Sequence, residues 1–168
     1  MILTRSTRRD KEVYDKLMSV VMNDPSFTSL MIGHYTLHNL SFLVKNTHLT
    51  FVSLNDANIR DLSALRGNAT IINLVLCSNE INDLSPLEGN TTLNHLDLSD
   101  NQISDVSPLS GCTLEKLILS VNLIEHVQFI EHNTTITHLE LHRNKIRNLP
   151  SLSNNTTLKH LSIDLNKI

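Results

Sequence analysis

The chain has 168 residues, of which 40% are hydrophobic and 18% charged, and its formal net charge is −3 at pH 7. This length fits one domain, and the slightly acidic balance argues against a protein that binds nucleic acid through a basic surface. The unbroken apolar stretches are far too short to span a membrane, so we expect neither membrane nor nucleic acid among its partners. Cys77 and Cys112 lack the spacing of a metal motif, and no signal peptide is evident. These features predict free thiols and a soluble, cytoplasmic protein.

Residues 1–26 differ from the rest of the chain. Apolar residues at helical spacing occur at Val13, Leu17, Val20 and Val21. The tripeptide at 23–25, Asn-Asp-Pro, signals a turn after them. We therefore predict an N-terminal capping helix and turn over 1–26, because the exposed end of a repeat array needs an atypical covering unit. A helix that contacts a membrane or a partner protein is the alternative interpretation.

From residue 27 onward, apolar side chains recur with a period of 22 residues, shortened once to 21. Six positions of each repeat carry this pattern, namely 1, 4, 6, 11, 14 and 17 counted from its first apolar residue. The first positions are Phe27, Leu49, Ile71, Leu93, Leu114, Ile136 and Leu158. Such a period is typical of a solenoid of stacked units. The sequence therefore predicts a second region, 27–168, with six complete repeats and a truncated seventh.

Each repeat contains one predicted strand and one return segment. Positions 3 to 8 alternate, as in 94–99, which indicates a half-buried strand with side chains at positions 3, 5, 7 and 8 directed outward. Position 9 is asparagine in five successive repeats, and we expect its amide to bond to the backbone where the strand bends. The return segments 85–87 and 107–109 read Ser-Pro-Leu, which predicts a single 3₁₀ turn capped by the serine.

Five of the six return segments end with a second asparagine, at position 20. These residues are Asn46, Asn68, Asn90, Asn133 and Asn155. Because glycine and asparagine tolerate a left-handed backbone, positions 19 and 20 are expected to end the helical turn in that conformation.

The segment 93–109 follows the pattern Leu-x-x-Leu-x-Leu-x-x-Asn-x-Ile-x-Asp-Val-Ser-Pro-Leu, which resembles the leucine-rich repeat superfamily. The repeat length resembles that of SDS22-like repeats, which are shared with bacterial internalins. The Asn-Thr-Thr-Leu junctions at 90–93 and 155–158 resemble those of ribonuclease-inhibitor-type repeats. The resemblance implies an α/β solenoid with a parallel concave sheet of about seven short strands and 3₁₀ turns or coil on its convex side. It also implies that the concave face binds a ligand.

Apolar residues occupy outward positions where the repeat pattern predicts solvent. They are Met31, Phe51, Val75, Ile118 and Val121. Apolar side chains gathered on one face indicate an interface, whereas scattered exposure needs no explanation. We predict Phe51, Val75, Ile118 and Val121 as apolar anchors for a partner. The residues expected to supply charge complementarity are Asp97, Lys116, His138, Glu140 and Arg143.

Histidines and carboxylates gather near the C-terminal end. The group comprises His138, Glu140, His142, Arg143, His160 and Asp164. Imidazole and carboxylate groups on adjacent strands could hold zinc, or they could form a solvated mixed-charge surface. Protonation of His138 and His160 could also make partner binding depend on pH. We predict no metal ligand, cofactor or catalytic residue, since no catalytic motif appears.

These features predict a non-enzymatic module that binds a partner protein, of unknown identity, on its concave face. One alternative is a regulatory subunit of a protein phosphatase, by analogy with SDS22-like proteins. Another is a metal-binding protein built on His138 and His160. The seventh repeat stops at Ile168, its position 11, so self-association through this uncapped end is a further possibility.

Overall fold

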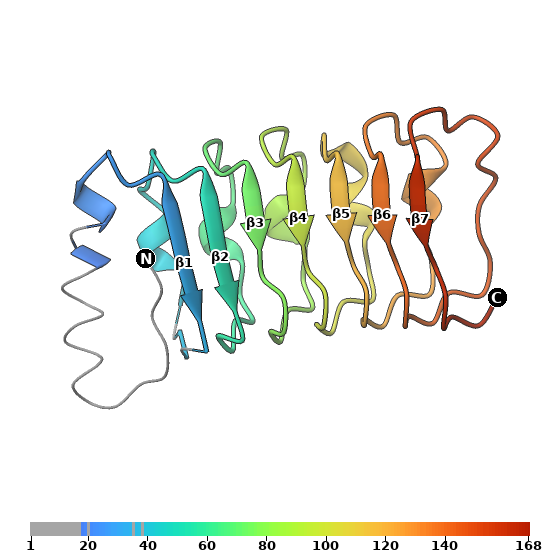
Figure 1. The fold of residues 1–168 in the computed structure, drawn as a ribbon, viewed down its shortest axis with the longest axis horizontal. Coiled ribbons are helices and arrows are strands. Elements are labelled where there is room, and N and C mark those ends of the chain that lie inside the picture. The colour runs from blue at the N-terminus through green and yellow to red at the C-terminus, as the bar shows by residue number, and fades with distance from the viewer. Residues whose placement is uncertain (1–17, 20, 35, 38) are drawn as a thin grey trace.

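The computed structural model describes residues 18–19, 21–34, 36–37 and 39–168. In this part of the chain, strands β1 to β7 form one parallel sheet in sequence order (Figure 1). They are β1 (Ser29–Gly33), β2 (Phe51–Asn55), β3 (Asn73–Val75), β4 (His95–Asp97), β5 (Lys116–Ile118), β6 (His138–Glu140) and β7 (His160–Ser162). The predicted sheet of about seven short parallel strands is confirmed.

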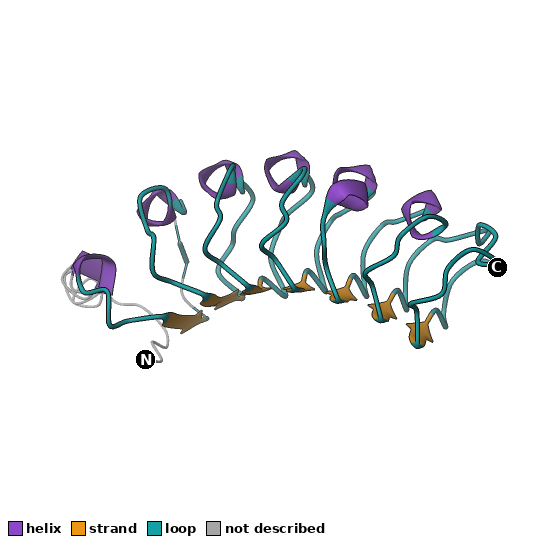
Figure 2. Cartoon of the chain, turned by 90° about the horizontal axis from the view of Figure 1, so that it is seen from above, coloured by secondary structure: helices purple, strands orange, loops and turns teal. Residues whose placement is uncertain are grey.

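The return segments lie on the opposite side of the solenoid. Their 3₁₀ turns are η1 (Ser41–Leu43), η2 (Ser63–Leu65), η3 (Ser85–Leu87), η4 (Ser107–Gly111) and η5 (Gln128–Ile130). The sixth return is coil with a turn at 153–154. Figure 2 shows the strands along the inner edge of a gentle arc and the turns along its outer edge. The predicted 3₁₀ turns or coil on the convex side are therefore confirmed.

The repeated apolar side chains form a continuous core between the sheet and the turns. Leu96 and Leu98, at positions 4 and 6 of one repeat, are fully buried, as the alternation of the strand predicts. Leu149 and Ile168 also occupy repeat core positions, but they are exposed. No further turn packs over them in the part of the chain that the structure describes.

The predicted N-terminal helix falls mostly outside the described residues, which exclude Val13, Leu17 and Val20. Residues 18–19 and 21–23 are helical. Met18 and Val21 belong to the buried core, and the carbonyl oxygen of Val21 lies 3.1 Å from Nε2 of His48. Among the described segments, no helix combines the length and apolar character needed to cross a membrane.

A ladder of buried asparagines at position 9 ties successive repeats together. Asn101 donates from Nδ2 to the carbonyl oxygens of Leu76 and Leu98, at 3.0 and 3.1 Å. Its Oδ1 accepts the N–H of Ile81 at 3.0 Å. The corresponding residues are Asn79, Asn122, Asn144 and Asn166. The predicted bonding of this amide to the backbone is confirmed, and the bonds also cross to the preceding repeat.

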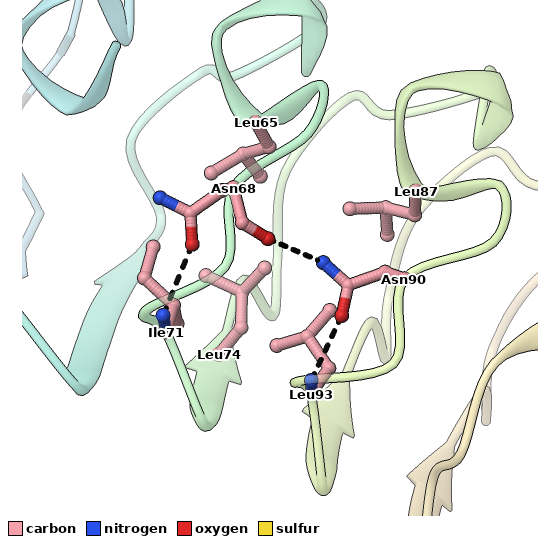
Figure 3. Close-up of a pocket in the computed structure, with 7 residues that line it drawn as sticks. All are labelled: Leu65, Asn68, Ile71, Leu74, Leu87, Asn90 and Leu93. Atoms are coloured by element: carbon pink, nitrogen blue, oxygen red, sulfur yellow. Dashed lines mark hydrogen bonds between the residues drawn. The ribbon is translucent and has the colours of Figure 1, made fainter. Parts of the chain in front are cut away.

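The asparagines at position 20 form a second ladder (Figure 3). Oδ1 of Asn90 accepts the N–H of Leu93 at 2.8 Å, and its Nδ2 donates to the carbonyl oxygen of Asn68 at 2.9 Å. Of positions 19 and 20, which were expected to be left-handed, position 19 has this conformation where it is glycine, since Gly67 and Gly89 carry positive φ angles, whereas the asparagines at position 20 do not. Glycine adopts that conformation without a Cβ clash, which leaves the asparagine side chain free to bond.

Cys112 replaces asparagine in this second ladder, in the one repeat that is a residue short. Its Sγ donates to the carbonyl oxygen of Leu87 at 3.2 Å, as Nδ2 of Asn155 donates to that of Ile130 at 3.0 Å. Cys112 is a free cysteine, and burial raises the pKa of its thiol. It therefore serves as a packed hydrogen-bond donor.

The 3₁₀ turns begin differently from the prediction. The serine does not cap the turn; an aspartate two residues earlier holds it. Oδ1 of Asp83 accepts the N–H of Ser85 at 2.8 Å, and Oδ2 accepts its hydroxyl at 3.0 Å. Asp61 bonds in the same way to Ser63, and these bonds lower the pKa of the Asp61 carboxyl. An Asx turn of this kind satisfies the first free N–H of the turn.

Candidate functional site

The strand register aligns the outward side chains in two rows across the concave sheet. The position 3 row contains Phe51, Asn73, His95, Lys116, His138 and His160. The position 5 row contains Ser53, Val75, Asp97, Ile118, Glu140 and Ser162. Side chains that are neighbours in a row are about 4.8 Å apart, the usual distance between strands. Seven of the nine predicted partner-binding residues therefore share this face.

The predicted apolar anchors do not form one unbroken patch. Phe51, Val75 and Ile118 lie on β2, β3 and β5, and each is half-buried rather than fully exposed. Asp97 separates Val75 from Ile118 in the position 5 row. Phe51 lies diagonally across from Val75, since its partner in the register is Asn73. A partner that makes apolar contacts with this face would therefore contact two separate regions of the sheet, one at Phe51 and Val75 and the other at Ile118.

Val121 and Arg143 lie outside the strands, contrary to the prediction that strands continue to position 8. The strands end at position 5 or 7, and every position 8 residue has a left-handed backbone. These residues are His34, Asp56, Ser78, Asp100, Val121, Arg143 and Leu165, with φ between 51° and 58°. The chain leaves the sheet at this point, and the reversal requires the unusual φ angle. Val121 and Arg143 therefore border the sheet at its strand ends.

Two of the predicted charged residues differ in their bonding. Asp97 accepts both the N–H and the hydroxyl of Ser99, at 2.9 and 2.7 Å, so its carboxylate supports the strand end. Lys116 stands between His95 and His138 in the position 3 row. Both bonds of Asp97 are accepted by its Oδ1, and its Oδ2 takes no part in them. Asp97 and Lys116 are therefore both candidates for contact with a charged partner.

The predicted histidine cluster separates into two parts. The rings of His138 and His160 stack with their centroids 5.7 Å apart, and Nδ1 of His138 lies 2.8 Å from the hydroxyl of Thr137. Nδ1 of His142 instead lies 2.7 Å from the hydroxyl of Ser120. Within the described residues, no three histidine, cysteine or carboxylate side chains converge as metal ligands. This geometry supports the mixed-charge surface rather than a zinc site.

Comparison with known proteins finds both the repeat and the fold elsewhere. The "Leucine Rich repeat" family matches residues 89–107 and 132–149. The solved structure of internalin F from Listeria monocytogenes str. 4b F2365 aligns with a TM-score of 0.72 at 24% identity. The functional domain of InlJ from Listeria monocytogenes aligns with a TM-score of 0.67 at 23% identity. The chain therefore has the leucine-rich repeat fold, and two of its segments match the family itself.

The similarity to internalins concerns the fold. The alignment with internalin F covers 84% of this chain but 44% of that structure. For InlJ the shares are 86% and 31%. Internalin C2 of the same Listeria strain aligns with a TM-score of 0.59 at 23% identity, over 83% of this chain and 73% of that one. No curated protein matches the chain significantly by sequence.

Sequence reasoning named His142 and Asp164 but missed Ser120 beside them. These three residues occupy position 7 of consecutive repeats, and a search for chemical groups spaced by one repeat could have found the serine. A serine nucleophile must be accessible to substrate, but Ser120 is only 2% exposed. Asp164 accepts the Ser162 hydroxyl at 3.1 Å, and no ion pair joins it to His142 among the residues described. The bond between Ser120 and His142 therefore orients the histidine at the surface.

The backbone of Val121 yields a stability prediction. A β-branched residue is poorly accommodated at its φ of 58°, whereas asparagine adopts this conformation readily. Val121→Asn should raise the free energy of unfolding by about 1 kcal/mol, as measured by urea denaturation. Val75→Asn is the matched control, because Val75 lies in strand β3 and should gain nothing. Equal stability of wild type and Val121→Asn would mean that the valine is not strained.

Proposed function

We propose that this leucine-rich repeat protein is a non-enzymatic module that binds a partner protein on its concave sheet. Leucine-rich repeat proteins generally mediate protein–protein interaction, which supports the class of function. We choose the concave face because Phe51, Val75 and Ile118 occupy outward positions on its strands. Each of these strands pairs with a neighbouring strand on both sides. Side chains on such rigid strands lose little conformational entropy on binding.

The proposed binding residues divide into anchors and charged groups. Phe51, Val75, Ile118 and Val121 would supply apolar contacts, and Val121 at the strand ends is 36% exposed. The charged contributors are Asp97, Lys116, His138, Glu140 and Arg143. Charges around apolar anchors determine the choice of partner more than the affinity.

A capture experiment tests the concave face. The variant Phe51→Glu/Val75→Glu/Ile118→Glu should lose the partner that wild type retains from a cell extract, because buried carboxylates without partners oppose association. Retained proteins are identified by mass spectrometry, after circular dichroism has shown that each variant is folded.

The control places a single carboxylate on the convex side. Val44 follows turn η1 and is 62% exposed, so Val44→Glu should retain the partner. If the triple variant captures the same proteins as wild type, the concave-face proposal is wrong. Loss of the partner from Val44→Glu alone would instead locate the binding site on the convex side.

A further inference from the structure

A row of nitrogen-bearing side chains crosses the C-terminal half of the concave sheet. His95, Lys116, His138 and His160 lie opposite one another on β4 to β7. His138 and His160 are exposed, whereas His95 and Lys116 are half-buried. This basic row is straight and continuous, unlike the apolar anchors, which Asp97 interrupts.

The charge of this half of the face depends on the protonation of histidine. Other charged groups lie beside the basic row, on strands β4 to β7 or on the residues next to these strands. They are Asp97, Asp100, Glu115, Glu140, Arg143, Lys159 and Asp164. With neutral histidines, three cationic groups including Lys116 face five carboxylates, so the surface is net negative. Protonation of His95, His138, His142 and His160 makes it net positive. Histidine is the side chain that gains charge between about pH 8 and 5.

The histidines of the basic row do not respond equally. Burial, and then the neighbouring Lys116 ammonium, lower the pKa of His95. His95 therefore takes up its proton at a lower pH than an ordinary histidine. His138 and His160 are the exposed histidines of the row. Their stacked rings, 5.7 Å apart, repel each other when both are charged. An anion placed over both rings would offset this repulsion.

We infer that the basic row binds an acidic segment of the partner protein, and that this binding strengthens as the pH falls from neutrality. The inference rests on the proposed function, since it names the chemistry of the partner and a regulation of the same face. Carboxylates on alternate residues of an extended segment point the same way, and can follow the row from Lys116 to His160. By linkage, an anion that binds protonated histidines better also favours their protonation.

A direct binding measurement tests the inference. The probe is a rhodamine-labelled decapeptide of alternating glutamate and serine, whose carboxylates stay largely ionised at about pH 5.5. Fluorescence anisotropy at constant ionic strength should give about tenfold tighter binding at pH 5.5 than at pH 7.5 for wild type. His138→Gln/His160→Gln should lose this gain. A peptide with glutamine in place of glutamate should not bind.

The matched control removes two histidines from the other side of the solenoid. His126 and His132 are exposed and flank turn η5, so His126→Gln/His132→Gln should keep the full pH response.

Absence of binding at both pH values would overturn the inference, as would a pH response that survives in His138→Gln/His160→Gln. If Phe51→Glu/Val75→Glu/Ile118→Glu loses the partner while the peptide shows no pH response, only the acidic-segment inference fails. If the peptide responds but that variant keeps the partner, the proposed function fails instead.

Discussion

Asn101→Ala is expected to lower the free energy of unfolding by about 3 kcal/mol, because several buried backbone groups would lose their partner together. The side chain satisfies the carbonyl oxygens of Leu76 and Leu98 and the N–H of Ile81. Alanine supplies neither donor nor acceptor, and the buried site leaves little room for water to replace them. The loss should therefore exceed that of an ordinary surface hydrogen bond.

Urea denaturation followed by circular dichroism measures the Asn101→Ala effect. Asn154→Ala is the matched control, because Asn154 is exposed on the sixth return, and its replacement should change stability by less than about 0.5 kcal/mol. Similar losses in the two variants would show that the position 9 ladder does not stabilise the solenoid beyond a surface asparagine.

Leu117→Ala is expected to cost about 3 kcal/mol for a different reason, namely the cavity left in the core. Leu117 is fully buried and lies in register between Leu96 and Leu139. Each unit of a solenoid contacts only its neighbours, so the cavity weakens both interfaces of the fifth repeat. Thermal unfolding should show a clear fall in Tm.

Leu165→Ala provides the same chemical change at a side chain that is 64% exposed. Its effect should stay within about 0.5 kcal/mol, since little apolar surface is removed from a buried site. If Leu117→Ala is no more destabilising than Leu165→Ala, the core is not packed as the burial of Leu117 indicates.

Much of the fold was predictable because one chemical pattern returns with a nearly constant period. Leu74, Leu96 and Leu117 occupy the same repeat position, and the structure places them opposite one another in the sheet. A period of this length therefore predicts the number of strands, their parallel order and their register. The alternation within each strand also predicts which side chains face outward. Seven of the nine candidate binding residues accordingly lie in the two outward rows.

The local backbone could not be predicted in the same way. Positions 19 and 20 were both expected to be left-handed, but only the glycines Gly67 and Gly89 at position 19 are, and Asn90 at position 20 bonds across the turn instead. Val121 has a positive φ although its β-branched side chain disfavours one. At Val121 the path of the chain as it leaves the sheet determines the dihedral angles and overrides the preference of the residue. Gly67 and Gly89 lie instead where the chain leaves a 3₁₀ turn, and their conformation is one that glycine adopts readily.

The sequence by itself determined the solenoid, its parallel sheet and the face on which each repeated side chain lies, because these depend on periodicity alone. Only the tertiary structure decided which side chains meet across the repeats. The stacking of His138 on His160 and the bond from Ser120 to His142 are examples. Each depends on side-chain orientation between residues about one repeat apart, and no pattern along the chain specifies that orientation.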